Sequence, residues 1–211
     1  MPDGELAVTP ASTAVAHSHG EDRAHGTPGQ LQPGPHLKVT ERREPSPKDL
    51  ERAGLFIQQA RQSLEKYQDY HVAFQEGYRV FAPEVPQVEY HFINPRAALM
   101  NINSKDPTRP TALLYKKVGD GYQWVGAMYS APLETPEEAL DEFFPLGVTQ
   151  WHAHINICVP REIRGWESLV NDSQFGLEGS IDRKEECDAA GGRFLPDLFG
   201  WMAHIDLSEA Q

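Results

Sequence analysis

The chain has 211 residues, enough for one domain or for a domain with a tail. Its 31 Asp and Glu against 19 Lys and Arg give a formal net charge of −12, which disfavours general binding to nucleic acid or to an anionic membrane surface. No segment approaches the roughly 18 apolar residues that a transmembrane helix needs, so we expect no membrane span. The N-terminus lacks the basic start and apolar block of a secretion signal. We therefore expect a cytoplasmic protein, or a periplasmic or secreted one if a leader is missing from this sequence.

Residues 1–45 are predicted to form a disordered tail. They contain 6 Pro and 5 Gly, few large apolar residues and no sustained periodicity. Such a segment cannot bury enough surface to offset the entropy lost on ordering. Ser46, Pro47 and Asp49 then supply the N-cap, the first-turn proline and the first-turn acid of a helix. We therefore predict a single folded domain over residues 46–211.

A long amphipathic helix is predicted from about Pro47 to about Gly77, with Tyr70 as the place where it would break. Apolar or aromatic positions recur there at spacings of 3 or 4, namely Ala53, Phe56, Ala60, Leu64, Tyr67, His71, Phe74 and Tyr78. His71 lies on this stripe and is predicted to face inward, as a core histidine rather than as a metal ligand.

Short β-rich segments separated by turn residues follow the helix. The predicted strands are residues 88–93, 112–118, 122–129, 151–159 and 199–207, and Gly119, Asp120 and Gly121 indicate a hairpin between the second and third. Residues 132–141 are predicted to form a short helix or loop, and residues 183–190 a short helix. The predicted fold is α+β, with the long helix packed on a mostly antiparallel sheet.

Alternation along two strands puts histidines opposite an apolar face. His152 and His154 share one face of the strand 151–159, and His204 lies with Met202 and Asp206 on one face of the last strand. The opposite faces hold Trp151, Ala153, Ile155, Ile157 and Val159, and Trp201, Ala203, Ile205 and Leu207. One face of each strand is therefore expected to pack in the core. The other face is expected to carry functional side chains or to line a polar interior.

The histidines predict a metal site. Side chains at positions i and i+2 of a strand point the same way from backbone positions about 7 Å apart, so His152 and His154 can converge on one ion. His204 and His91, each in a predicted strand, are the candidates for further ligands. Imidazoles suit transition metals rather than calcium or magnesium, and we expect zinc or copper. The alternative is that His152 and His154 are half-buried residues bonded to backbone carbonyls.

Two carboxylates share the faces of the strand histidines. Glu89 lies two residues before His91, and Asp206 two residues after His204. Each is a candidate oxygen ligand, an acceptor that fixes a histidine tautomer, or a general base acting on a metal-bound water. Each is also interpretable as a solvated carboxylate at a strand edge. The N-terminal histidines form a weaker cluster expected to capture metal only loosely, comprising His17, His19, His25 and His36.

The two cysteines, Cys158 and Cys187, are 29 positions apart and form no Cys-x-x-Cys motif, which excludes a structural zinc finger. They are interpretable as a disulfide, as one thiolate ligand, or as two inert thiols. Cys158 lies about 13 Å along the strand from His154, too far to share one ion without a bulge. We favour the disulfide, which in turn favours an oxidising compartment.

Several segments carry a resemblance to a known family. They include Tyr90 to Pro95, Asp106 to Pro110, Val125 to Tyr129, Trp151 to His154, and the final Phe-Gly-Trp-Met-x-His run ending at His204. In this order they resemble a family of uncharacterised, often exported bacterial proteins, over about residues 46–207. The histidine-bearing strand, the hairpin and the Trp-His-x-His segment are also similar, more faintly, to plant oil-body-associated proteins. The resemblance supports the domain boundary and the histidine cluster and implies no particular reaction.

Three functions are compatible with the sequence. The favoured one is a metal-binding protein of carrier or sensor type, with a site saturated by histidines. The second is a mononuclear metalloenzyme, hydrolytic or oxidative, with an open coordination position beneath a cavity lined by Tyr115, Tyr129 and Trp124 and with a small-molecule substrate. The third is a metal-free scaffold or ligand-binding module. Oligomeric state has no signal in the sequence.

Overall fold

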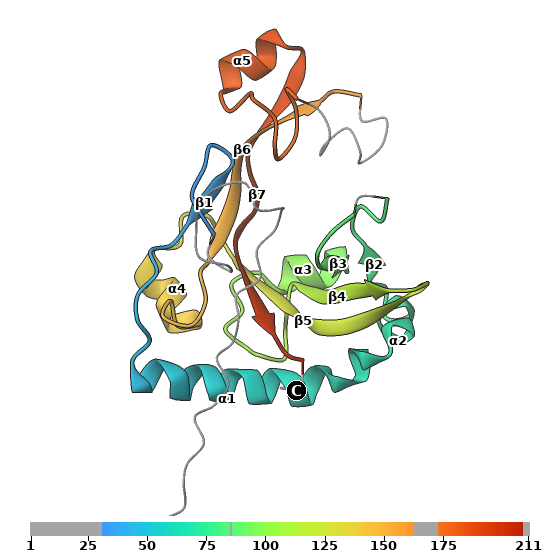
Figure 1. The fold of residues 1–211 in the computed structure, drawn as a ribbon, viewed down its shortest axis with the longest axis vertical. Coiled ribbons are helices and arrows are strands. Elements are labelled where there is room, and N and C mark those ends of the chain that lie inside the picture. Colours follow the sequence, from blue (N-terminus) through green and yellow to red (C-terminus); the bar gives the residue numbers. More distant parts are fainter. Residues whose placement is uncertain (1–30, 85, 163–172, 209–211) are drawn as a thin grey trace, which may run out of the picture.

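The computed structural model describes residues 31–84, 86–162 and 173–208 (Figure 1). The strands are β1 (Leu37–Val39), β2 (Arg79–Val80), β3 (Tyr90–Ile93), β4 (Ala112–Val118), β5 (Gly121–Ala131), β6 (His152–Pro160) and β7 (Gly192–Asp206). The helices are α1 (Pro47–Leu64), the 3₁₀ helix η1 (Glu65–Gln68), α2 (Tyr70–Gln75), α3 (Pro95–Asn101), α4 (Glu137–Phe143) and α5 (Lys184–Ala189). The fold is α+β, as the sequence predicts.

Helix α1 begins where the capping residues indicate. The Ser46 hydroxyl accepts a hydrogen bond from the Asp49 backbone N–H, and the Asp49 carboxylate accepts one from the Ser46 N–H. The predicted break occurs just before Tyr70, because the Asp69 side chain caps α2 by accepting from the backbone N–H of His71. Among the described residues, no helix combines the length and apolarity needed to cross a bilayer.

The strands form one seven-stranded sheet in the order β1-β6-β7-β5-β4-β3-β2, and every neighbouring pair is antiparallel. Figure 1 shows α1 running beneath the sheet, while β6 and β7 rise away from it as a long ribbon that ends at α5. The ribbon is irregular at Phe199 and Gly200, which both have φ of 68°, and its register shifts between His152 and His154. This bulge separates the part of β7 that pairs with β5 from the part near α5.

The two faces of the sheet have different contents. The helix face packs on α1 and contains most of the core, including Phe92, Tyr115, Tyr129, Trp201 and Ile205. The histidine face is the opposite one, on which His91 and His204 lie among the buried residues Leu114, Met128 and Met202. Because successive side chains of a strand alternate, both faces are built from the same strands.

The described structure begins earlier in the chain than the predicted boundary at Pro45. Strand β1 pairs with β6, with Leu37 opposite His154, and Leu31 and Thr40 are buried. His36, assigned from sequence to the loose tail cluster, is also buried. Its Nδ1 lies 3.0 Å from the Asn156 carbonyl oxygen and its Nε2 lies 2.7 Å from that of Gly179. The tail assignment is therefore wrong for residues 31–45, because β1 pairs with β6 as the edge strand of the sheet. Residues 1–30, with His17, His19 and His25, lie outside the described residues.

The outer end of the β6–β7 ribbon carries a cross-link. Cys158 of β6 and Cys187 of α5 form the predicted disulfide. Gly192 lies against it, because a Cβ at that position would come within 2.6 Å of the Cys158 sulfur. The disulfide fastens α5 to the ribbon at the end remote from α1. Residues 163–172, within the polar stretch between β6 and α5, lie outside the described residues.

Candidate metal centre

His91 and His204 meet on the histidine face although they lie on different strands. They lie on β3 and β7, which are separated in the sheet by β4 and β5, so that a flat sheet would hold their backbones about 14 Å apart. Their Nε2 atoms are 3.2 Å apart, and their ring centroids are 5.0 Å apart. The two imidazoles therefore lean toward one another across β4 and β5.

The tautomer of His91 is set by Gln87. The Gln87 side-chain amide nitrogen donates to the carbonyl oxygens of Phe81, at 2.8 Å, and Ala82, at 3.0 Å. These two bonds fix the orientation of the amide, so its oxygen faces Nδ1 of His91 at 3.4 Å. An amide oxygen only accepts, so Nδ1 of His91 is the protonated nitrogen and its Nε2 carries a lone pair.

Glu89 lies beside His204. Its carboxylate is 3.6 Å from Nδ1 of His204, an ion-pair distance rather than a hydrogen bond, and both side chains are almost fully buried. The Nε2 atoms of His91 and His204 are 3.2 Å apart, at hydrogen-bond distance. Because Nε2 of His91 carries a lone pair, a proton on Nε2 of His204 satisfies this contact. A metal ion bound by both nitrogens would replace that proton.

The other two predicted ligands continue this row of imidazoles. The ring centroid of His152 is 5.1 Å from that of His204 and 5.7 Å from that of His154. His152 is 2% exposed. Burial lowers the pKa of His154, while a hydrogen bond with the backbone of His36 acts in the opposite direction. The structure thus gathers all four histidines, in the order His91, His204, His152 and His154.

The cluster is not arranged as a finished coordination sphere. Within residues 31–84, 86–162 and 173–208, no group of three or more His, Cys, Asp or Glu side chains has the arrangement needed to hold a metal ion. The pair formed by His91 and His204 is in place, and His152 lies beside it. A third ligand would have to be supplied by rotation of a neighbouring side chain.

The two candidate carboxylates have different surroundings. Glu89 is 2% exposed and lies behind His204, so its interpretation as a solvated strand-edge carboxylate is wrong. Asp206 is half-buried, and its Oδ1 accepts hydrogen bonds from the backbone N–H and the hydroxyl of Ser208. The roles proposed from sequence for Asp206 remain predictions.

His71 does not face the core. Its side chain is 64% exposed, and its Nδ1 lies 2.9 Å from the Asp69 carboxylate. The prediction that it faces inward is wrong. The helix breaks at Asp69, so the residues that follow no longer continue the row of apolar side chains along α1.

The predicted aromatic lining lies on the other side of the sheet. Tyr115, Tyr129 and Trp124 belong to the core of the helix face. The Tyr115 hydroxyl donates to the Tyr67 carbonyl at 2.8 Å, and the Tyr129 hydroxyl to the Pro107 carbonyl at 2.6 Å. The prediction that these three residues line a cavity above the histidines is therefore wrong.

Sequence reasoning did not identify Gln87 or the strained backbone beside it. Ala82, which accepts from Gln87, has φ of 46°, and Phe199 has φ of 68°. The rings of Phe81 and Phe199 make an edge contact with centroids 5.9 Å apart, so the segment before β3 meets the bulge of β7. Such strain in residues other than glycine is concentrated at functional sites in proteins. A glutamine four residues before a histidine carries no recognisable signal in sequence.

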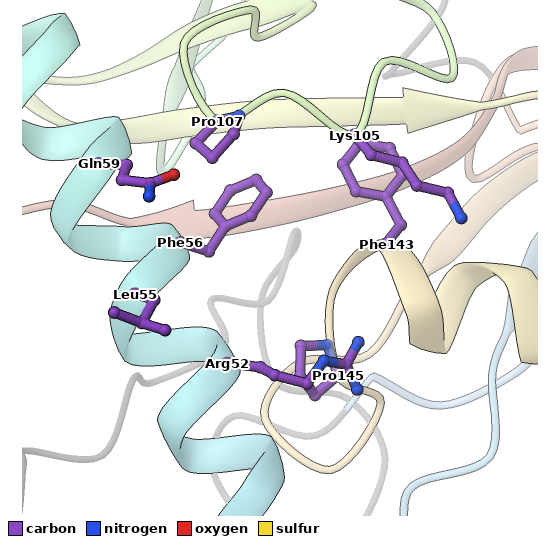
Figure 2. Close-up of a pocket in the computed structure, with 8 residues that line it drawn as sticks. All are labelled: Arg52, Leu55, Phe56, Gln59, Lys105, Pro107, Phe143 and Pro145. Carbon is purple, nitrogen blue, oxygen red and sulfur yellow. The ribbon is translucent and has the colours of Figure 1, made fainter.

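Two shallow depressions lie away from the histidines. One has a volume of about 260 Å³, and Figure 2 shows the side chains that line it, among them Arg52, Leu55 and Phe56 of α1 with Lys105 and Phe143. The other lies beside α3, at Arg96 and Met100. Neither depression is lined by a predicted ligand.

Comparisons of the chain with protein-family models, with curated proteins and with solved structures find no match. The resemblance to exported bacterial proteins and to plant oil-body-associated proteins therefore stays a prediction.

Proposed function

We propose that this protein binds a transition-metal ion between His91 and His204, with His152 as third ligand and His154 beside it. The observation that carries the proposal is the 3.2 Å separation of the two Nε2 atoms. Two imidazoles on one tetrahedral ion have donor nitrogens about 3.3 Å apart, given metal–nitrogen bonds of about 2.0 to 2.1 Å. The observed spacing therefore matches that of two ligands of one ion.

The groups behind the two histidines support the same proposal. Histidine ligands of metals usually donate their second ring nitrogen to a carboxylate or to another oxygen. Gln87 supplies such an oxygen to His91, and Glu89 supplies one near His204. The Nε2 lone pair of His91 is thereby directed at Nε2 of His204.

His152 is the natural third ligand. Two imidazoles bound to one tetrahedral ion have ring centroids about 5 Å apart, and His152 already lies 5.1 Å from His204. The proposal requires the His152 side chain to rotate so that a donor nitrogen reaches the ion. His154, with centroid 5.7 Å from His152, is the candidate for a fourth position.

We favour a carrier or sensor over a metalloenzyme. Glu89 lies against Nδ1 of His204, where a carboxylate orients an imidazole and is directed away from a water on the ion. Burial of His152 and His204 suits retention of an ion rather than rapid exchange of substrate. The disulfide supports an oxidising compartment, and we propose a periplasmic or secreted location.

The test is a zinc(II) titration of the untagged full chain against a chromogenic chelator, with cobalt(II) absorption as the measure of tetrahedral coordination. We expect one tightly bound ion. His91→Ala, a change at a half-buried position, should weaken binding by more than the ~10- to 100-fold typical of losing an outer partner of a ligand. His71→Ala is the matched control at an exposed histidine and should leave binding unchanged.

Loose binding to the N-terminal histidines is removed by a background with His17, His19 and His25 changed to Asn. If the wild-type chain and His91→Ala bind metal equally in this background, the proposal is wrong. Absence of stoichiometric binding of both zinc(II) and copper(I) by the wild-type chain leads to the same conclusion.

A further inference from the structure

Two buried methionines alternate with the histidines on the histidine face. Met128 of β5 is directly opposite His204 of β7, and Met202 of β7 is directly opposite His152 of β6. Met202 also precedes His204 by two residues and so shares its face. Each of the two central imidazoles therefore has a thioether as its cross-strand neighbour.

Strand register places each methionine next to a histidine on the same face. Residues directly opposite each other on one face of an antiparallel pair have Cβ atoms about 4.5 to 5.5 Å apart. Met128 and Met202 are each 3% exposed, and they pack with Ala112, Leu114 and Val125. Their sulfur atoms therefore belong to a dry region that adjoins the imidazoles.

The ligand chemistry distinguishes between metals. Imidazole suits both zinc and copper, whereas a thioether is a soft ligand that selects copper(I). Charge favours the same ion: a buried charge is costly unless it is balanced. One monovalent ion is balanced by the Glu89 carboxylate beside His204, while a divalent ion among neutral imidazoles and thioethers would leave an excess charge.

We infer that the site is selective for copper(I), with the sulfur atoms of Met128 and Met202 joining the imidazoles of His204 and His152 in its coordination. This inference rests on the proposed metal binding at the same cluster. It identifies the cargo as a soft monovalent cation rather than zinc(II).

The test compares Met128→Leu, Met202→Leu and the double variant with the wild-type full chain. Leucine conserves volume and apolarity, so these variants should fold. Copper(I) affinity is measured by competition with bicinchoninate under nitrogen with ascorbate, after mass spectrometry confirms that the disulfide is intact. Zinc(II) affinity is measured in parallel. Met100→Leu, at a residue of α3 that is 60% exposed, is the matched control.

We expect each single substitution to lower copper(I) affinity by ~10-fold or more and zinc(II) affinity by less than ~3-fold, on the scale of effects around metal ligands. Copper X-ray absorption of the wild-type chain should show a sulfur scatterer that the double variant lacks. This spectrum of the wild-type chain tests the inference even where a variant folds poorly.

The outcomes separate this inference from the proposed function. Unchanged copper(I) affinity in the double variant, or a copper spectrum of the wild-type chain without sulfur, overturns the copper inference and leaves metal binding intact. Equal losses for both metals would mean that the methionines act through packing, which also overturns it. Failure of the wild-type chain to bind either ion removes both.

Discussion

The two faces of the sheet use the same strands for different purposes. On the helix face, Phe92 stacks on Phe74 with ring centroids 5.2 Å apart and packs in a tilted arrangement against Tyr115 at 4.2 Å. On the histidine face, the preceding residue His91 contacts His204. A single step along β3 thus passes from packing to polar chemistry. Alternate residues of one strand therefore serve different ends: those on the helix face stabilise the fold, and those on the histidine face serve the proposed function.

The faces also differ in how they satisfy polar groups. The helix face is apolar and aromatic, and its tyrosines donate outward to backbone carbonyls such as that of Tyr67. The histidine face buries Glu89, His152 and His204. Burying polar groups in this way costs stability unless they are paired. We therefore expect the histidine face to serve metal binding and the helix face to stabilise the fold.

The largest expected effect comes from Phe92→Ala compared with its neighbour His91→Ala. Truncating fully buried Phe92 should lower the free energy of unfolding by about 3 to 5 kcal/mol, because a large cavity opens among Phe74 of α2, Tyr115 and Tyr122. The change at His91 should cost about 1 kcal/mol or less. Urea unfolding with a metal chelator present measures both.

The comparison between faces fails if the two changes destabilise the metal-free protein equally. It is sharpened if the folded fraction of Phe92→Ala retains metal affinity while His91→Ala loses it. Ile57→Val, at a partly buried position that packs on the same core, is a mild control for perturbing the helix face.

A second prediction concerns how α1 is held against its face. The Arg43 guanidinium, and then Ser46, hold the pKa of Asp49 well below its usual range. A carboxyl with a lowered pKa in the folded state stabilises that state above its ordinary pKa, and the effect is lost as pH falls. Asp49→Asn should lower the free energy of unfolding at neutral pH by about 1 to 3 kcal/mol, a range that allows for screening at partly exposed Arg43 and for the weakened cap.

The difference between the wild-type chain and Asp49→Asn should shrink as pH falls below about 4, where the unfolded carboxyl is protonated. Thermal unfolding at several pH values measures it. Glu51→Gln, at an exposed position of the same helix, is the control and should show no such pH dependence. A difference independent of pH would mean that the Asp49 charge contributes nothing.

Much of the fold could be predicted because local rules and packing agree. The strand predicted over residues 112–118 matches β4, and the cap at Ser46 starts α1 as expected. Strand β7 begins at Gly192, earlier than predicted, because pairing with β6 overrides the turn signals of Pro196 and Asp197. Helix α3 was missed because Asn94 and Pro95 also cap a helix, with the Asn94 side chain accepting from two backbone N–H groups.

The site was predictable only within each strand. Alternation assigns His152 to the face opposite Trp151, but which face of one strand meets which face of another depends on sheet order and register. His91 and His204 are 113 positions apart, and the order of the strands in the sheet brings them together. The same lack of register information placed Tyr115 and Tyr129 beside the histidines, whereas they lie across the sheet.

The smallest expected effect comes from Gln87→Met, which tests whether the histidine face is organised for binding. The substitution removes the oxygen facing Nδ1 of His91 and the two hydrogen bonds that fix the amide. His91 should then lose its preferred tautomer and orientation, and metal affinity should fall about 10-fold, near the lower end for an outer partner of a ligand. Competition titration with zinc(II) and copper(I) measures the change.

Gln59→Met, at an exposed position of α1, matches the chemistry of this substitution on the other side of the sheet and should leave affinity unchanged. Gln87→Met also removes donors from two carbonyls and should lower the free energy of unfolding by about 1 to 2 kcal/mol. The two readouts discriminate between roles: lower stability with unchanged metal affinity would make Gln87 a structural residue of the segment before β3. A fall in affinity for both ions would instead support Gln87 as the residue that directs the His91 lone pair toward His204.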